Sequence, residues 1–239
     1  MIVIYAIDAL EYTLVEEFDC KNLMQSSYGK TDISEFSEPR TMVLWSSFMT
    51  GENKEDYILA KGDKEMWNTR IDLKETFFSL FDNPKILDLP GFNYDKEQHE
   101  MERALLKDFF DAEEKEDKER IKKEYNNLSF EHHRKIKDEF KEALNEDHDF
   151  VLGYFSVADV IGHLNFGNRT IMKMIYTDLD EIASEIKEDM IILSDHGMQK
   201  IGVFGDHSEY GFWSTNFKDL GGPKITDFYG VIEKMMKKK

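Results

Sequence analysis

The sequence has 239 residues, of which 41% are hydrophobic and 13% aromatic, so the chain is long enough to form one domain with a sizeable buried core. Its 49 Asp and Glu residues exceed its 31 Lys and Arg residues, and the formal net charge of −18 disfavours binding to a nucleic-acid backbone. The single cysteine, Cys20, excludes an intrachain disulfide, and no apolar run approaches the ~18 residues of a membrane span, so we expect a cytoplasmic protein without a membrane partner.

From the N-terminus onward, short apolar runs alternate with helical patterns. Runs of strand length lie at 2–7, 85–89, 149–157 and 189–194. Helical patterns lie at 9–18, 41–49, 74–81, 170–187 and 226–237. The segment YGKT at 28–31 lacks the full phosphate-loop pattern, and we interpret it as a turn. The alternation predicts an α/β fold with a mostly parallel central sheet flanked by helices.

Residues 96–148 interrupt this alternation. They are highly charged, contain no Gly or Pro, and carry apolar residues at helical spacing, such as Ile136, Phe140 and Leu144. We therefore expect a helical hairpin inserted into a core that is formed by residues 1–95 and 149–239. This hairpin is either a cap over a functional site or a solvated decoration, and the sequence favours neither.

Three of the apolar strand patterns lead into an aspartate: Asp8, Asp159 and Asp195. In an open parallel sheet the carboxyl ends of the strands share one edge, where ligands bind. The three carboxylates are therefore expected to converge there. Because they would repel one another and raise each other's pKa, a positive group is expected between them.

Histidines accompany these aspartates. His196 follows Asp195 directly, His163 lies four residues after Asp159, and His207 lies in the later loop GDHSEYG. An aspartate after a strand is often only a helix cap, and a lone histidine seldom binds metal. The combination, however, provides ligands for two divalent cations, with zinc favoured by the imidazoles and manganese as the alternative.

The four remaining histidines have no such context. They lie in or beside the helical segment, and we expect them to be surface residues: His99, His132, His133 and His148.

A hydroxyl that such metals could activate lies in the segment EPRTMVLWSSFMTG at 38–51. Thr41 is at the predicted start of a helix, where backbone amides favour an alkoxide or a phosphoryl group. The simpler alternative is that Thr41 is only the N-cap. Ser46 and Ser47 lie deeper in the same helix and would have to turn toward the metals.

Five features occur in a fixed order along the chain: the apolar strand before Asp8, the segments PRTMVLWSSFMTG, DVIGH and SDHGM, and a later histidine. Taken together, they resemble the alkaline phosphatase superfamily. They are most similar to its nucleotide pyrophosphatase/phosphodiesterase branch, in which the nucleophilic Thr lies ten residues before the Gly of a TG pair, as Thr41 does before Gly51. The resemblance implies an alkaline-phosphatase-like core with two metals. The residues implied for one metal are Asp8, Thr41, Asp195 and His196, and those for the other are Asp159, His163 and His207.

The implied activity is metal-dependent hydrolysis of phosphoric esters through a phosphothreonine at Thr41, with a small phosphorylated substrate such as a nucleotide. The chain departs from the branch after Gly51, where the usual HG and Asn that hold the phosphate are missing. Four residues are alternatives for that role: Asn53, Lys61, Asn68 and Arg70. A phosphomonoesterase, a phosphosugar mutase or a metal-binding relative without catalysis remain rival functions. A sulfatase is disfavoured, because Met, Val and Leu follow Thr41.

Overall fold

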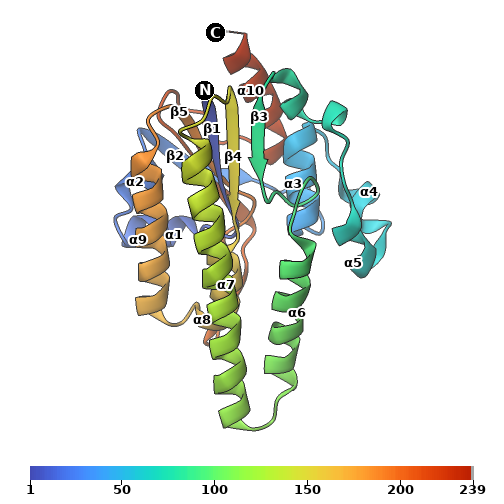
Figure 1. Cartoon of the computed structure of the whole chain (residues 1–239), viewed down its shortest axis with the longest axis vertical. Helices are drawn as coiled ribbons and strands as arrows, with labels where there is room; N and C mark the ends of the chain where they lie inside the picture. Colours follow the sequence, from blue (N-terminus) through green and yellow to red (C-terminus); the bar gives the residue numbers. More distant parts are fainter. Residues whose placement is uncertain (238–239) are drawn as a thin grey trace.

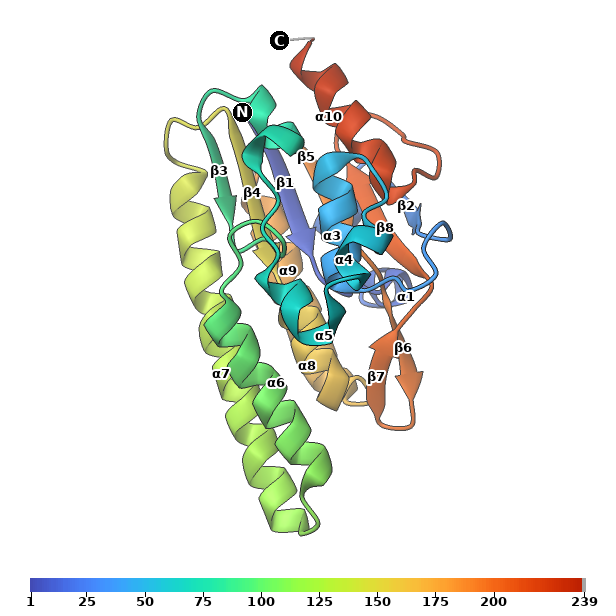
Figure 2. The same cartoon turned by 90° about the vertical axis from the view of Figure 1, so that its right-hand side faces the viewer.

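The computed structural model describes residues 1–237 as three layers, in which a six-stranded sheet lies between two sets of helices (Figures 1 and 2). The strands follow the order β2-β8-β5-β1-β4-β3 across the sheet. β5, β1, β4 and β3 are parallel neighbours, whereas β8 is antiparallel to both β5 and β2. The prediction of an α/β fold with a mostly parallel sheet is therefore confirmed.

The strand bounds follow the predicted apolar runs for β1, β3, β4 and β5, whereas β2 and the interior strand β8 lie where no strand was predicted. The sheet contains β1 (Ile2–Ile7), β2 (Ser27–Asp32), β3 (Pro84–Leu87), β4 (Phe150–Phe155), β5 (Asp189–Ser194) and β8 (Tyr210–Thr215). A separate hairpin contains β6 (Met198–Ile201) and β7 (Phe204–His207). The turn predicted at 28–31 is wrong, because these residues belong to β2. A polar segment can form this strand because it lies at the edge of the sheet, where most of its residues are not buried.

The strand β1 shows why the central runs are apolar throughout. It has a parallel neighbour on each side, and all six of its residues are buried. Successive side chains point to opposite faces of the sheet, so both faces of β1 must be apolar. One hydrophobic core contains Val3, Tyr5 and Ile7, and the other contains Ile2, Ile4 and Ala6.

Helices cover both of these cores. One core is covered by α1 (Tyr12–Glu17), α2 (Lys21–Met24), α7 (Lys115–Ala143), α8 (Val157–Asn165) and α9 (Arg169–Glu185). The other is covered by α3 (Thr41–Thr50), α4 (Glu55–Leu59) and α10 (Phe228–Met236). Short elements fill the connections, namely α5 (Gly62–Glu65), η1 (Met66–Asn68), η2 (Leu73–Glu75), η3 (Phe77–Leu80) and η4 (Ile225–Asp227). The α-helix predicted at 74–81 is replaced by the 3-10 helices η2 and η3. None of the helices within residues 1–237 combines the length and the apolar character needed to cross a bilayer.

α6 (Lys96–Asp111) and α7 form a long helical hairpin that continues beyond the carboxyl ends of the parallel strands (Figure 2). The C-terminal part of α7 packs on the sheet, where Phe140 stacks on Tyr5 with ring centroids 5.7 Å apart. The part of the hairpin beyond the sheet packs on α8, and the Tyr125 hydroxyl donates a hydrogen bond to the Val160 carbonyl at 2.8 Å. The division into a core and an insertion remains a prediction.

A buried ion pair connects this hairpin to the sheet. Asp88 follows β3, and its Oδ2 lies 2.8 Å from Nε2 of His132 on α7. Glu102 on α6 is also buried and accepts a hydrogen bond of 2.7 Å from Gln98 Nε2. The expectation that His132 is a surface residue is therefore wrong.

The other histidines of this region also have partners. His133 is buried, and its Nε2 lies 2.7 Å from Asp178 Oδ2 of α9. His148 and His99 are half-buried; His148 pairs with Glu146 at 2.9 Å. Amphipathic helices that pack on both the sheet and each other bury polar positions that sequence periodicity assigns to solvent.

We expect Glu102 to make the stability of the protein depend on pH. Burial raises the pKa of Glu102 from 4.5 to about 7. Because the pKa is higher in the folded than in the unfolded state, the contribution of Glu102 to the free energy of unfolding decreases as the pH rises between these two values. Glu102→Gln should therefore gain stability relative to the wild type from about pH 5 to about pH 8, by up to about 3 kcal/mol.

Urea unfolding of both proteins across this pH range measures the difference. Glu100→Gln, an exposed position on the same helix, is the control. A constant difference between wild type and Glu102→Gln at every pH would contradict the prediction.

Candidate metal centre

The predicted metal ligands lie at the carboxyl ends of the central strands. Asp8 directly follows β1, and Asp195 and His196 directly follow β5. The prediction that Asp159 lies at the end of a strand is wrong, because β4 stops at Phe155 and Asp159 lies in the first turn of α8.

The other two histidines belong to neighbouring elements. His163 lies one turn after Asp159 on α8, so that both side chains are on the same face of the helix. His207 is the last residue of β7 rather than part of a loop. The hairpin of β6 and β7 therefore has His196 before its first strand and His207 at the end of its second.

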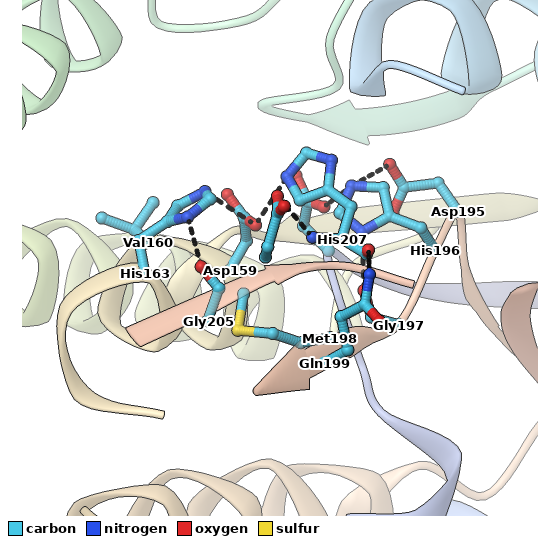
Figure 3. A network of polar contacts seen from close by, with 12 residues as sticks. Asp159, Val160, His163, Asp195, His196, Gly197, Met198, Gln199, Gly205 and His207 are labelled. Carbon is cyan, nitrogen blue, oxygen red and sulfur yellow. Dashed lines mark hydrogen bonds and ion pairs between the residues drawn. The ribbon is translucent and has the colours of Figure 1, made fainter. Parts of the chain in front are cut away.

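Asp159, His163 and His207 form one group of possible ligands (Figure 3). Oδ1 of Asp159 lies 3.3 Å from Nε2 of His163 and 3.5 Å from Nε2 of His207. One ligand atom from each of the three residues lies within 4.8 Å of the others. This set matches the residues that the resemblance implies for one of the two metals.

Asp8, Asp159 and His196 form a second group of possible ligands. Nε2 of His196 lies 3.3 Å from Oδ1 of Asp8 and 3.4 Å from Oδ2 of Asp195. The rings of His196 and His207 stack with centroids 3.8 Å apart, which joins the two groups. The structure thus brings all six predicted Asp and His residues into one continuous cluster, in which Asp159 belongs to both groups.

Several polar atoms of this cluster have no hydrogen bond within residues 1–237, although they are buried. They are Asp8 Oδ1, Asp159 Oδ1, both carboxylate oxygens of Asp195, and His196 Nε2. Buried polar atoms are almost always satisfied by hydrogen bonds, and an exception calls for a specific explanation. Oxygen and imidazole nitrogen atoms that point at one another from several elements are the donor set that divalent cations require.

The charges of the aspartates require compensation. Burial and the neighbouring Asp159 carboxylate raise the pKa of Asp8 to about 7. Burial and the nearby Asp8 carboxylate raise the pKa of Asp195 above its usual range. No lysine or arginine among the described residues forms an ion pair or hydrogen bond with either carboxylate. A bound cation would therefore relieve this repulsion.

The surroundings shift the pKa values of His163 and His196 in opposite directions. Asp159 raises the pKa of His163 to about 9, whereas burial and the neighbouring His207 lower the pKa of His196 to about 3. His196 is therefore neutral, which is the form in which an imidazole binds metal. Its Nδ1 lies 3.1 Å from the Gly197 carbonyl, so that Nε2 faces the aspartates (Figure 3).

Thr41 forms no hydrogen bond with any of the six Asp and His residues, and its position follows from the helix that it begins. It is the first residue of α3, and the N-cap is Arg40, whose side chain makes no capping hydrogen bond. One turn later, Trp45 packs edge-on against Tyr154 at 5.5 Å, and the Tyr154 hydroxyl donates a hydrogen bond to Asp8. Because residues four apart share a helix face, Thr41 lies on the side of α3 that faces Tyr154 and Asp8.

The two serines of α3 point elsewhere. Ser47 Oγ donates to the Val43 carbonyl at 2.7 Å and accepts from Lys54 N at 2.9 Å, so its hydroxyl is used inside the local structure. Ser46 is fully buried, and a side chain at Gly91 would come within 2.9 Å of its Oγ, so it faces the loop after β3. Neither serine forms a hydrogen bond with the six Asp and His residues.

The four polar residues considered for holding a phosphate are engaged in local contacts. Asn53 Oδ1 accepts a hydrogen bond of 2.8 Å from Glu55 N at the start of α4. The Lys61 ammonium lies over the Tyr57 ring, 4.5 Å from its centroid. These contacts keep both side chains in the exposed segment around α4.

The other two are held in the same way. Asn68 Nδ2 donates to Glu65 at 2.7 Å, and Arg70 donates to the Tyr94 carbonyl at 3.1 Å. Neither Asn68 nor Arg70 forms a polar contact with the six Asp and His residues. The N-terminus of α3, which has no side-chain cap, offers backbone donors of the kind that bind phosphoryl oxygens.

Tyr154 was not predicted from the sequence. Its hydroxyl donates to Asp8 from the penultimate residue of the neighbouring strand β4, whose residues are all buried. Nothing in an apolar strand distinguishes a tyrosine with a polar partner from one that only packs.

Comparisons with known proteins were made with both the sequence and the structure. Neither the protein-family models nor the curated protein sequences contain a match to this chain. Among solved structures, the chain is similar to murine ectonucleotide pyrophosphatase/phosphodiesterase 5, with 11% sequence identity and a TM-score of 0.44. The similarity covers 84% of this chain and 58% of that chain.

Replacing one of the crowded carboxylates should have opposite effects with and without metal. In the metal-free protein at pH 8, Asp195→Asn should increase the free energy of unfolding by about 1–2 kcal/mol, because burial beside Asp8 raises the pKa of Asp195 and makes its ionised form unfavourable in the folded state. In the presence of zinc, the wild type should become the more stable protein, because it gains the free energy of ligand binding.

Thermal unfolding of both proteins in chelator and in zinc measures this reversal. Asp189→Asn, at the exposed start of β5, is the matched control and should behave as the wild type does. The same order of stability in chelator and in zinc would refute a metal-binding role for Asp195.

Proposed function

We propose that this protein is a metal-dependent hydrolase of phosphoric esters, of the phosphodiesterase type, with Thr41 as its nucleophile. The observation that carries the proposal is the cluster of three aspartates and three histidines, in which five buried polar atoms lack hydrogen bonds within the described residues. It is supported by the position of Thr41 at the uncapped start of α3, on the helix face toward Asp8. The sequence resemblance to the nucleotide pyrophosphatase/phosphodiesterase branch supports the same reaction class.

The cluster can hold two divalent cations. Asp159, His163 and His207 would hold one of them. Asp8, Asp195 and His196 would hold the other, with Thr41 adjacent. When bound, such ions lower the pKa of hydroxyl groups and neutralise the charge that develops on a phosphoryl group during transfer.

Thr41 and α3 provide the covalent chemistry and the binding of the phosphoryl group. The Thr41 oxygen forms a bond to phosphorus while the bond to the leaving oxygen breaks, which gives a phosphothreonine. Water then cleaves this ester and restores the hydroxyl. The first backbone amides of α3 have no side-chain cap, so they can donate hydrogen bonds to the phosphoryl oxygens.

The charge of the site favours a diester over a monoester. A phosphate monoester carries about two negative charges at neutral pH, and a diester carries one. Recognition of a dianion normally uses arginine, whose planar group binds two oxygens at once. Within residues 1–237, no arginine or lysine contacts the six Asp and His residues, and Arg40 near Thr41 is paired with Glu38 and Asp63.

Substitution of Thr41 tests the proposed nucleophile. Thr41→Ala should lower kcat for bis-p-nitrophenyl phosphate by several orders of magnitude, because the covalent step is lost, and it should retain both metals. Thr41→Ser keeps the hydroxyl and should retain partial activity. Turnover and metal content should be measured on the same preparation, with p-nitrophenyl phosphate as the monoester for comparison.

Thr50→Ala is the matched control for this experiment. Thr50 lies on the same helix with the same 8% exposure as Thr41, but its hydroxyl donates to the Ser46 carbonyl. Its loss should reduce stability without changing kcat. Near-wild-type turnover by Thr41→Ala with both metals bound would exclude Thr41 as the nucleophile.

A further inference from the structure

Outside the metal cluster, two carboxylates are almost completely buried and form no ion pair with any described residue, Glu102 and Glu11; of these, Glu11 lies beside the cluster. It is 2% exposed and lies three residues after Asp8, at the N-cap position of α1. A buried carboxylate without a cation is unfavourable unless several hydrogen bonds satisfy its oxygens.

Four hydrogen bonds satisfy Glu11. Its Oε1 accepts from the Thr13 backbone N at 3.0 Å, the Thr13 hydroxyl at 2.8 Å and the Tyr210 hydroxyl at 2.8 Å. Its Oε2 accepts from Met198 N at 3.0 Å. Hydrogen bonds to an ionised carboxylate are stronger than those between neutral groups. Two of the four come from Thr13 within α1, and two come from residues far along the chain.

The two distant donors lie on either side of the β6–β7 hairpin. Met198 is two residues after His196, and Tyr210 is three residues after His207. The backbone joins the two ends as well, since Gly197 N donates to the Tyr210 carbonyl at 2.7 Å and Ser208 N donates to the Gly197 carbonyl at 3.0 Å. Glu11 therefore binds both ends of the hairpin at the points next to its two histidines.

The packing around Gly197 shows how closely Glu11 approaches this turn. A Cβ atom at residue 197 would lie 2.4 Å from Glu11 Oε2 and 2.6 Å from Ser208 Oγ. Both distances are too short for any side chain. The glycine of the SDHGM segment is thus required by the contact between Glu11 and the hairpin.

The segment that carries Glu11 is itself fixed to the sheet. Leu10 N donates to Ser194 Oγ at 2.9 Å, and Ser194 Oγ donates to the His196 carbonyl at 2.6 Å. Glu11 N donates to the Tyr176 hydroxyl at 2.7 Å. Hydrogen bonds through Ser194 and through Glu11 therefore connect the turn after β1, which begins with Asp8, to the turn that contains His196.

We propose that Glu11 is a positioning residue that holds His196 and His207 in register with Asp8 and Asp159. The proposal rests on the metal centre of the proposed function, and Glu11 itself binds neither metal nor substrate. The β6–β7 hairpin is not part of the main sheet, so its histidines depend on contacts such as these for their place. Loss of the Glu11 contacts would let the two imidazoles move relative to the aspartates.

Zinc affinity measured by competition with a chromophoric chelator tests this role. The side chain of Glu11→Gln has one oxygen that accepts hydrogen bonds and one NH2 group that donates them. The NH2 group would therefore face either Met198 N or the donors that bind Oε1 in the wild type. We expect this variant to weaken zinc binding about 10- to 100-fold. Tyr210→Phe removes one of the four bonds and keeps the ring under Lys30, and it should weaken binding several-fold.

Glu16→Gln is the matched control. Glu16 belongs to the same helix and also accepts hydrogen bonds from tyrosine hydroxyls, those of Tyr12 at 2.9 Å and Tyr28 at 3.2 Å, but it does not contact the β6–β7 hairpin. It should bind zinc as the wild type does. Melting temperatures of all metal-free variants separate a loss of affinity from a loss of fold.

The outcomes are distinct. Wild-type affinity in a folded Glu11→Gln, or in Tyr210→Phe if Glu11→Gln does not fold, overturns the positioning role. A wild type that binds no zinc overturns both this role and the proposed function. Zinc binding that depends on Glu11, without hydrolysis of any phosphoric ester, supports the positioning role and overturns the proposed hydrolase activity.

Discussion

The mutual repulsion of Asp8, Asp159 and Asp195 is the constraint on which the rest of the structure depends. Three carboxylates converge where strands and the first turn of a helix meet; His163 pairs with Asp159, but no described lysine or arginine neutralises Asp8 or Asp195. In a buried environment this repulsion would destabilise the fold of the metal-free protein. Two divalent cations would turn the same arrangement into a stabilising one. Stability and chemistry would then depend on the same ions.

The fold brings the charged side chains together from separate strands and helices. Parallel strands β1, β4 and β5 direct their carboxyl ends to one edge, so the aspartates come from segments that are far apart in the sequence. The histidines come from α8, from the turn after β5 and from a hairpin outside the main sheet; Ser194 forms a hydrogen bond to this turn and Glu11 to the hairpin. The helical hairpin of α6 and α7 packs on α8 beside this edge, and an ion pair between Asp88 and His132 fixes it to the sheet (Figure 1).

The sequence predicted those features that depend on local pattern. Fully apolar runs identified β1, β4 and β5, whereas the interior strand β8 was missed because it mixes apolar and polar residues. Residues at strand ends, such as Asp8, could be assigned to one edge because parallel strands share it. The edge strand β2 was missed because its residues are polar, and the hydrogen bonds of Tyr154 and Glu11 were missed because their partners lie more than 140 residues away along the chain. The burial of His132 likewise depends on Asp88, which helical periodicity alone does not reveal.

The most direct test of the account is the metal content and metal position in crystals of the protein grown with zinc and without chelator. An anomalous-scattering map should show two peaks per chain. One should lie among Asp159, His163 and His207, and the other should lie between Asp8, Asp195 and His196. A map with no peak in the space between the three aspartates, from protein that is folded and zinc-saturated in solution, would contradict the account.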